Sequence, residues 1–208
     1  MRISLVLALA MGLSLSAQPT INVSDLPQGG TAYLRANGLP PLNADDINLD
    51  GSDVTWNFSD ILFQGDAQTE YFPMSSASLT TQFVFSSADH FTAFELPDFG
   101  ADLPIPISGA TVYREYGTNA YKTIGVGITT DLFDLPVNFT DEEELLPLPL
   151  TYGATLDASS AFALDLEGLF YYATDQVMDI EVDAWGTLLL PGGEYNCLRV
   201  KREFSALD

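Results

Sequence analysis

The clearest alternation of apolar and polar positions lies near the C-terminus, between Val177 and Phe204. From Met178 to Ala184 apolar residues alternate with acidic ones, which is the period of a half-buried strand. Gly186 breaks the alternation, and the turn 191–194 is followed by a second alternating run. We therefore predict two long paired strands. Acidic residues on the first strand would face Arg199, Lys201 and Arg202 on the second strand. Each such pair would stabilise the sheet by roughly 0.2–1 kcal/mol.

Short runs rich in aromatic and β-branched residues recur along the rest of the chain and predict further strands. They are 54–58, 69–72, 81–85, 90–96, 111–116, 121–128 and 161–172. About ten to thirteen short strands separated by turns are typical of an antiparallel sandwich. The sequence therefore predicts an all-β protein, an antiparallel β-sandwich of jelly-roll type. The Pro- and Gly-rich segment 97–109 leaves an alternative, two small β subdomains split there.

Residues 1–17 have the pattern of a signal peptide. Arg2 provides the positive start, the apolar stretch 3–15 follows, and small residues lead to Ala17. The apolar stretch is shorter than the about 20 residues of a spanning helix, so we expect no membrane insertion. We predict an exported protein, extracellular or at the cell surface, with the periplasm as the alternative. We expect residues 18–208 to form one β-sandwich domain. Truncation of this domain at its C-terminus, Asp208, stays open as an alternative.

The net charge of −22 makes polyanions unfavourable as binding partners. Nucleic-acid affinity depends on clustered Lys and Arg, so we expect no nucleic acid as a partner. Cys197 is the single cysteine, which excludes an internal disulfide.

One acidic segment has the start of a calcium-binding loop. Every second position from 46 to 52 carries a side-chain oxygen: Asp46, Asn48, Asp50 and Ser52. Gly51 lies between the last two, as in a loop that binds a hard cation. The twelfth position is Asn57, where such a loop needs a bidentate Glu. Two alternatives therefore stay open: a calcium site, or an acidic turn with no cofactor.

We predict no catalytic residues. His90 is the single histidine, and we expect it at the surface or at a strand edge. A carboxylate-dependent glycoside hydrolase would need only two acids, and 29 acidic residues leave the choice among them arbitrary. The candidates are Glu70, Glu95, Glu115, Glu167 and Glu181.

Aromatic residues suggest a second type of function, the binding of polysaccharide on a platform of stacked rings. The candidate rings are Trp56, Trp185, Tyr113, Tyr116, Tyr121, Tyr171 and Tyr172. The same residues fit the inward faces of strands equally well, so exposed coplanar rings would favour carbohydrate binding and inward-turned rings would count against it.

Several segments, taken in order, resemble the N-terminal region of exported Bacteroidota proteins that usually end in a type IX secretion sorting domain. The segments are 54–59, 146–153, 183–188, 190–195 and 198–202. The resemblance implies an exported β-sandwich-like module of unknown activity and supplies no catalytic residues. Since no sorting domain follows, the sequence is expected to be a fragment or the protein to stay in the periplasm. Our first functional hypothesis is a non-catalytic adhesive or structural module that contacts polysaccharide or other surface proteins. The alternatives are a carbohydrate-binding domain and a carboxylate-dependent glycoside hydrolase.

Overall fold

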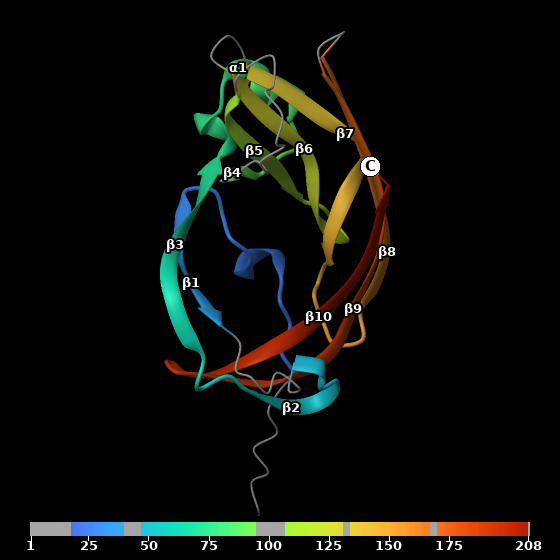
Figure 1. Cartoon of the computed structure of the whole chain (residues 1–208). Coiled ribbons are helices and arrows are strands. Elements are labelled where there is room, and N and C mark those ends of the chain that lie inside the picture. The colour runs from blue at the N-terminus through green and yellow to red at the C-terminus, as the bar shows by residue number, and fades with distance from the viewer. Residues whose placement is uncertain (1–17, 40–46, 95–106, 131–133, 167–169, 208) are drawn as a thin grey trace, which may run out of the picture.

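The computed structural model describes residues 18–39, 47–94, 107–130, 134–166 and 170–207. These residues form ten strands and little helix (Figure 1). The strands are β1 (Thr31–Leu39), β2 (Gly51–Asn57), β3 (Leu62–Pro73), β4 (His90–Phe94), β5 (Ile107–Tyr116), β6 (Ala120–Thr130), β7 (Asp134–Pro147), β8 (Thr155–Leu166), β9 (Phe170–Leu190) and β10 (Gly193–Leu207). The helical segments are η1 (Val23–Asp25), η3 (Met74–Ser76) and α1 (Leu79–Val84).

All ten strands belong to one sheet with the order β1-β3-β4-β5-β6-β7-β8-β9-β10. Neighbours in this order are antiparallel, and β2 pairs with β9 in parallel. The predicted all-β, antiparallel, sandwich-like architecture is confirmed. The strand order is largely a meander, simpler than the two Greek keys of a jelly roll.

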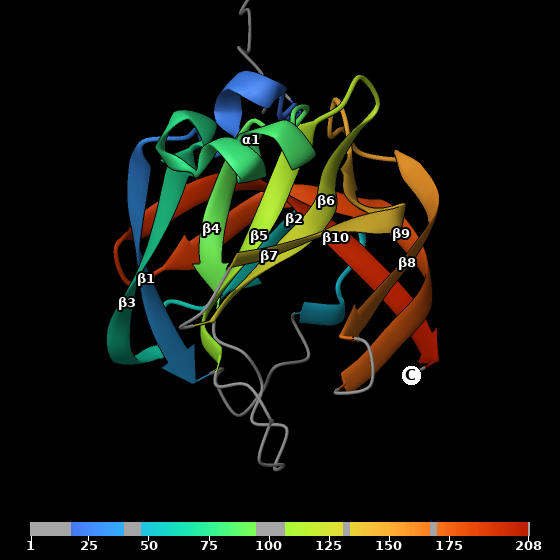
Figure 2. The ribbon, with the colours of Figure 1, turned by 90° about the horizontal axis from the view of Figure 1, so that it is seen from above.

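Strand β7 forms the corner at which the sheet folds over itself. It pairs with β6 up to Asn138 and again from Glu143, and between these stretches Asp141 pairs with Ala161 of β8. Beyond this corner, β8, β9 and β10 turn away from β4, β5 and β6 and pass beneath them (Figures 1 and 2). The result is two facing layers made from one sheet.

The predicted C-terminal strand pair is confirmed. Strands β9 and β10 pair along most of their length, with Leu190 opposite Gly193 at the turn. The apolar residues of the first alternating run are at most 2% exposed, whereas the acids Asp179 and Glu181 are exposed. Arg199 forms a salt bridge across the pair to Asp183, as the pattern predicts.

The other two C-terminal cations have different partners from the expected ones. Lys201 pairs with Glu203 of its own strand, and Arg202 pairs with Glu143 of β7. The sequence pattern specifies faces of strands, but it does not specify which side chains on a face meet.

The predicted strand 81–85 is wrong, because this segment is the helix α1 and its C-cap. Ser78 caps the helix, since its Oγ accepts a hydrogen bond from the backbone N–H of Thr81 at 3.2 Å. The helical turn also buries Phe85, which is 1% exposed and stacks on Tyr113 with 4.0 Å between ring centroids. The cap and this burial outweigh the strand propensity of Thr, Phe and Val.

The predicted break at 97–109 does not separate the sheet. Strands β4 and β5, which flank it, are hydrogen-bonded neighbours with Phe94 opposite Ala110. Residues 95–106 and the predicted signal peptide 1–17 lie outside the described residues.

Candidate functional site

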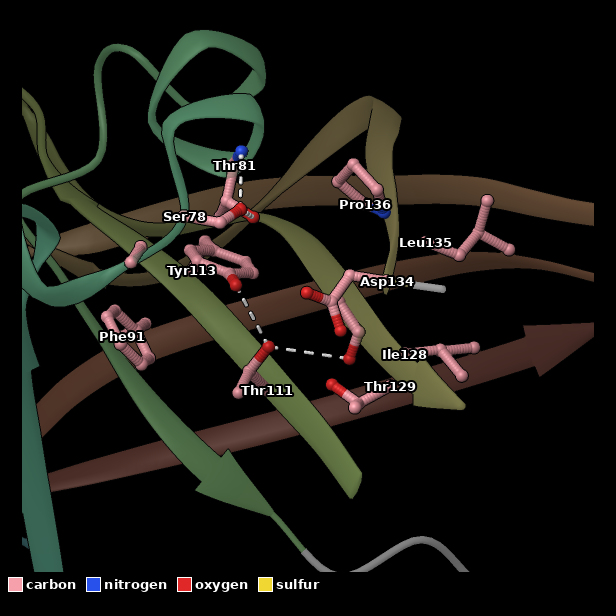
Figure 3. A pocket seen from close by; sticks show the side chains of 12 residues that line it. Ser78, Thr81, Phe91, Thr111, Tyr113, Ile128, Thr129, Asp134, Leu135 and Pro136 are labelled. Carbon is pink, nitrogen blue, oxygen red and sulfur yellow. Dashed lines mark hydrogen bonds between the residues drawn. The ribbon is translucent and has the colours of Figure 1, made fainter. Parts of the chain in front are cut away.

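A pocket of about 170 Å³ lies beside α1, on the side of β5 and β6 that carries this helix (Figure 3). Helix α1, the middle strands and the start of β7 all contribute to it. Its lining consists of Ala77, Ser78, Thr81, Phe91, Thr111, Tyr113, Gly127, Ile128, Thr129, Asp134, Leu135 and Pro136. Five of these residues carry hydroxyl groups, two carry aromatic rings, and one carries a carboxylate.

The N-terminal end of α1 forms one wall. The hydroxyl groups of Ser78 and Thr81 lie 2.9 Å apart and share a hydrogen bond. Thr81 is buried and Ser78 is exposed, so the pair extends from the core to the pocket's edge. The same capping interaction that starts the helix therefore places two hydroxyl groups on the pocket.

Gly127 of β6 forms the floor, opposite Thr111 of β5 and Pro136 of β7. A Cβ atom at position 127 would lie 2.6 Å from the Thr111 hydroxyl and 3.0 Å from the Tyr113 ring. The absence of a side chain at this position therefore leaves the space in which Thr111 and Tyr113 approach the strand.

The Thr111 hydroxyl stands at the centre of the floor (Figure 3). It lies 3.1 Å from the Tyr113 hydroxyl and 3.4 Å from the Gly127 carbonyl oxygen, and its single hydrogen is donated to one of them at a time. When Thr111 donates to the Gly127 carbonyl, its oxygen can accept from the Tyr113 hydroxyl. The two hydroxyl groups therefore form one pair of donors and acceptors on the floor.

Asp134 and Thr129 stand opposite each other on β7 and β6, and both are exposed. Asp134 is the one charged side chain of the lining. Phe91 is half-buried and its ring centroid is 5.5 Å from that of Tyr113. Neutral hydroxyl groups, two aromatic rings and a single negative charge thus line one small volume.

A second cluster of polar and aromatic side chains lies on the opposite face of the same strands, because His90 precedes Phe91 in β4. The expectation of a surface or edge histidine is wrong, since His90 is 0% exposed. Its Nε2 lies 3.0 Å from the Tyr121 hydroxyl, and the rings of Tyr71, Tyr116 and Tyr121 surround it with centroids at 5.2–5.9 Å.

Burial dominates the proton equilibria of this cluster. It lowers the pKa of His90 to about 4, with a further contribution from the positive charge of Arg114. It also raises the pKa of Tyr116 and of Tyr121. The imidazole is consequently neutral at pH 7, and with no accessible surface it fits a structural role.

The four residues of the predicted calcium loop are only partly described. Asp46 lies outside the described residues, Asn48 and Asp50 precede β2, and Ser52 lies within it, all three exposed. Two carbonyl oxygens of the loop accept hydrogen bonds, that of Leu49 from the Trp56 indole and that of Ile47 from Arg199. Among the described residues no three His, Cys, Asp or Glu side chains are placed to hold a metal ion. The calcium site stays a prediction.

The aromatic residues singled out in the sequence do not form one exposed platform, which counts against carbohydrate binding on a platform of stacked rings. Trp56, Tyr113 and Tyr121 are buried, and Tyr171 is 67% exposed. The remaining three, Trp185, Tyr116 and Tyr172, are half-buried. Of the seven, only Tyr113 lines the pocket.

The described candidate carboxylates are also absent from the pocket lining. Glu70 and Glu181 are exposed and Glu115 is half-buried, and none of them lines the pocket. Glu95 and Glu167 lie outside the described residues. Sequence reasoning missed Ser78, Thr111, Thr129 and Asp134, because such residues are common and these four lie in or next to different helices and strands.

Comparison with models of known protein families, with curated proteins and with solved structures gives no significant match. Within the described ranges, none of the helices has the length and hydrophobicity that a membrane-spanning helix needs.

Proposed function

We propose that this chain is a non-catalytic carbohydrate-binding module of an exported protein, and that the pocket beside α1 holds one terminal sugar residue. The observation that carries the proposal is the combination of five hydroxyl side chains with the rings of Phe91 and Tyr113 around a single cavity. Recognition of polysaccharide at a cell surface would give the module the adhesive role expected from its sequence.

The chemistry of the lining matches that of a sugar. Each sugar hydroxyl both donates and accepts, and so do the side chains of Ser78, Thr111 and Thr129. The apolar face of a sugar ring packs against aromatic rings, and the half-buried Phe91 is the candidate ring of the lining, since Tyr113 is buried. A volume of about 170 Å³ is below the about 300–1,000 Å³ of pockets for drug-sized ligands, which favours a single ring over a longer segment.

The single carboxylate favours binding over hydrolysis. Retaining and inverting glycosidases use two carboxyl groups about 5–10 Å apart around the scissile bond. Asp134 is the one carboxylate among the lining residues. It could orient a sugar hydroxyl, but no second carboxylate stands beside it among the described residues of the lining.

Nuclear magnetic resonance titration with neutral monosaccharides and short oligosaccharides tests the proposal. A binding sugar should shift the backbone amide signals of Phe91, Thr111 and Gly127. Thr111→Val removes the central hydroxyl with little change of volume and should weaken binding about five- to thirty-fold. Thr187→Val is the matched control, since Thr187 is half-buried in β9 and does not line the pocket.

The result that would overturn the proposal is equally direct. Absence of shifts for every sugar at high millimolar concentration would refute it. So would a Thr111→Val protein that is folded and binds as the unmodified protein does.

A further inference from the structure

We propose that Asp134 makes the pocket select sugar residues that carry a free ammonium group over those that carry a carboxylate. This inference rests on the proposed function, because it specifies the class of sugar that the same pocket prefers.

The position of Asp134 is the first support. It is the first residue of β7 and pairs with Thr129, and both residues line the pocket. Both side chains are exposed, so a ligand reaches them without any rearrangement of the core. A carboxylate accepts hydrogen bonds from an ammonium group, and these charge-assisted bonds are stronger than those between neutral groups.

The lack of a competing cation is the second support. No Lys or Arg in the described part of the chain forms a salt bridge with Asp134. On the neighbouring strand β6, Lys122 pairs with Glu142 and Glu144. Arg114 of β5 lies opposite His90, on the face away from the pocket. The carboxylate therefore keeps its charge available to a ligand.

The charge of the whole chain acts in the same direction. A net charge of −22 attracts cationic ligands and repels anionic ones. Because Asp134 is exposed, its direct contribution resembles that of a surface ion pair, so we expect about a three- to five-fold preference at low salt. The preference should shrink when salt shortens the screening length.

The experiment compares glucose, glucosamine and glucuronate as ligands of the full chain at pH 7 and about 20 mM salt, and again at about 500 mM salt. Glucosamine should bind most tightly and glucuronate least tightly. Asp134→Asn should remove the preference for glucosamine and improve the binding of glucuronate. Asp157→Asn removes the same charge from an exposed site on β8, outside the pocket, and should keep the preference.

Two failures are distinguishable. If glucose binds in the pocket but the three sugars keep the same ranking in both variants, the selectivity is refuted and the proposed function stands. If none of the three sugars nor any other glycan binds, the proposed function fails and this inference fails with it.

Discussion

Replacement of His90 by Gln should remove a defined part of the acid sensitivity of this protein. His90 is the single histidine and is fully buried, and its pKa is lowered from 6.5 to about 4. Between these values the unfolded chain binds a proton at His90 that the folded chain does not bind. Stability is therefore unaffected by His90 above pH 6.5 and decreases as the pH falls toward 4.

The magnitude follows from the size of the pKa shift. One pKa unit corresponds to about 1.4 kcal/mol, so the shift costs about 2 kcal/mol of unfolding free energy at pH 5 and about 3 kcal/mol at pH 4. Many carboxylates also titrate in this range, but they are common to both proteins. The difference between the unmodified protein and His90→Gln therefore isolates the histidine.

Urea unfolding of both proteins at pH 7.5, 6, 5 and 4 measures this difference. The unmodified protein should lose about 3 kcal/mol relative to His90→Gln between the first and the last pH. Gln keeps a hydrogen-bonding side chain toward Tyr121, so the variant is expected to fold. Parallel stability profiles of the two proteins, or an imidazole proton signal that titrates near pH 6.5 in the folded protein, would refute the reasoning.

Three further predictions concern the strands around β9. Arg199→Met should lower the free energy of unfolding by about 2–3 kcal/mol. It removes the two hydrogen bonds to Asp183, at 2.6 and 2.8 Å, and leaves that carboxylate largely buried without a partner cation. A decrease of less than about 0.5 kcal/mol in urea unfolding would contradict this. Gly186→Ala would place a Cβ 1.9 Å from the Val54 carbonyl oxygen and should cost about 3 kcal/mol or detach β2. Hydrogen exchange of the β2 amides would detect the detachment. Gly192→Ala, with 3.5 Å to its nearest neighbour, is the control and should change little. The calcium hypothesis predicts a higher Tm in added calcium that Asp50→Asn abolishes, and an unchanged Tm in calorimetry with and without a chelator would refute it.

The β9–β10 pair shows what local pattern is able to predict. Alternation in 178–184 identifies the buried face, because side chains of a strand point alternately to its two sides. Gly186, which breaks the pattern, is the residue at which β2 passes so close that no side chain fits. The sequence marks the irregular position, but which strand pairs there depends on long-range contacts that no local pattern contains.

Helix α1 and His90 show the opposite case. Composition favours a strand at 81–85 and an exposed or edge position for the histidine, and both expectations are wrong. In each, packing against distant residues decides: Phe85 is buried on Tyr113, and His90 is enclosed by three tyrosines. Burial of a large aromatic side chain contributes more to stability than the propensity differences of a few tenths of a kcal/mol between residue types.

The sequence by itself determined that the chain forms paired strands and which side of the C-terminal pair is buried, because those properties depend on residues close together in the chain. Only the tertiary structure decided the corner in β7, the parallel pairing of β2 with β9, and the pocket. The pocket joins Ser78, Thr111, Thr129 and Asp134 from four separate segments. Their proximity results from the order and registers of the strands, which depend on contacts between segments far apart in the chain.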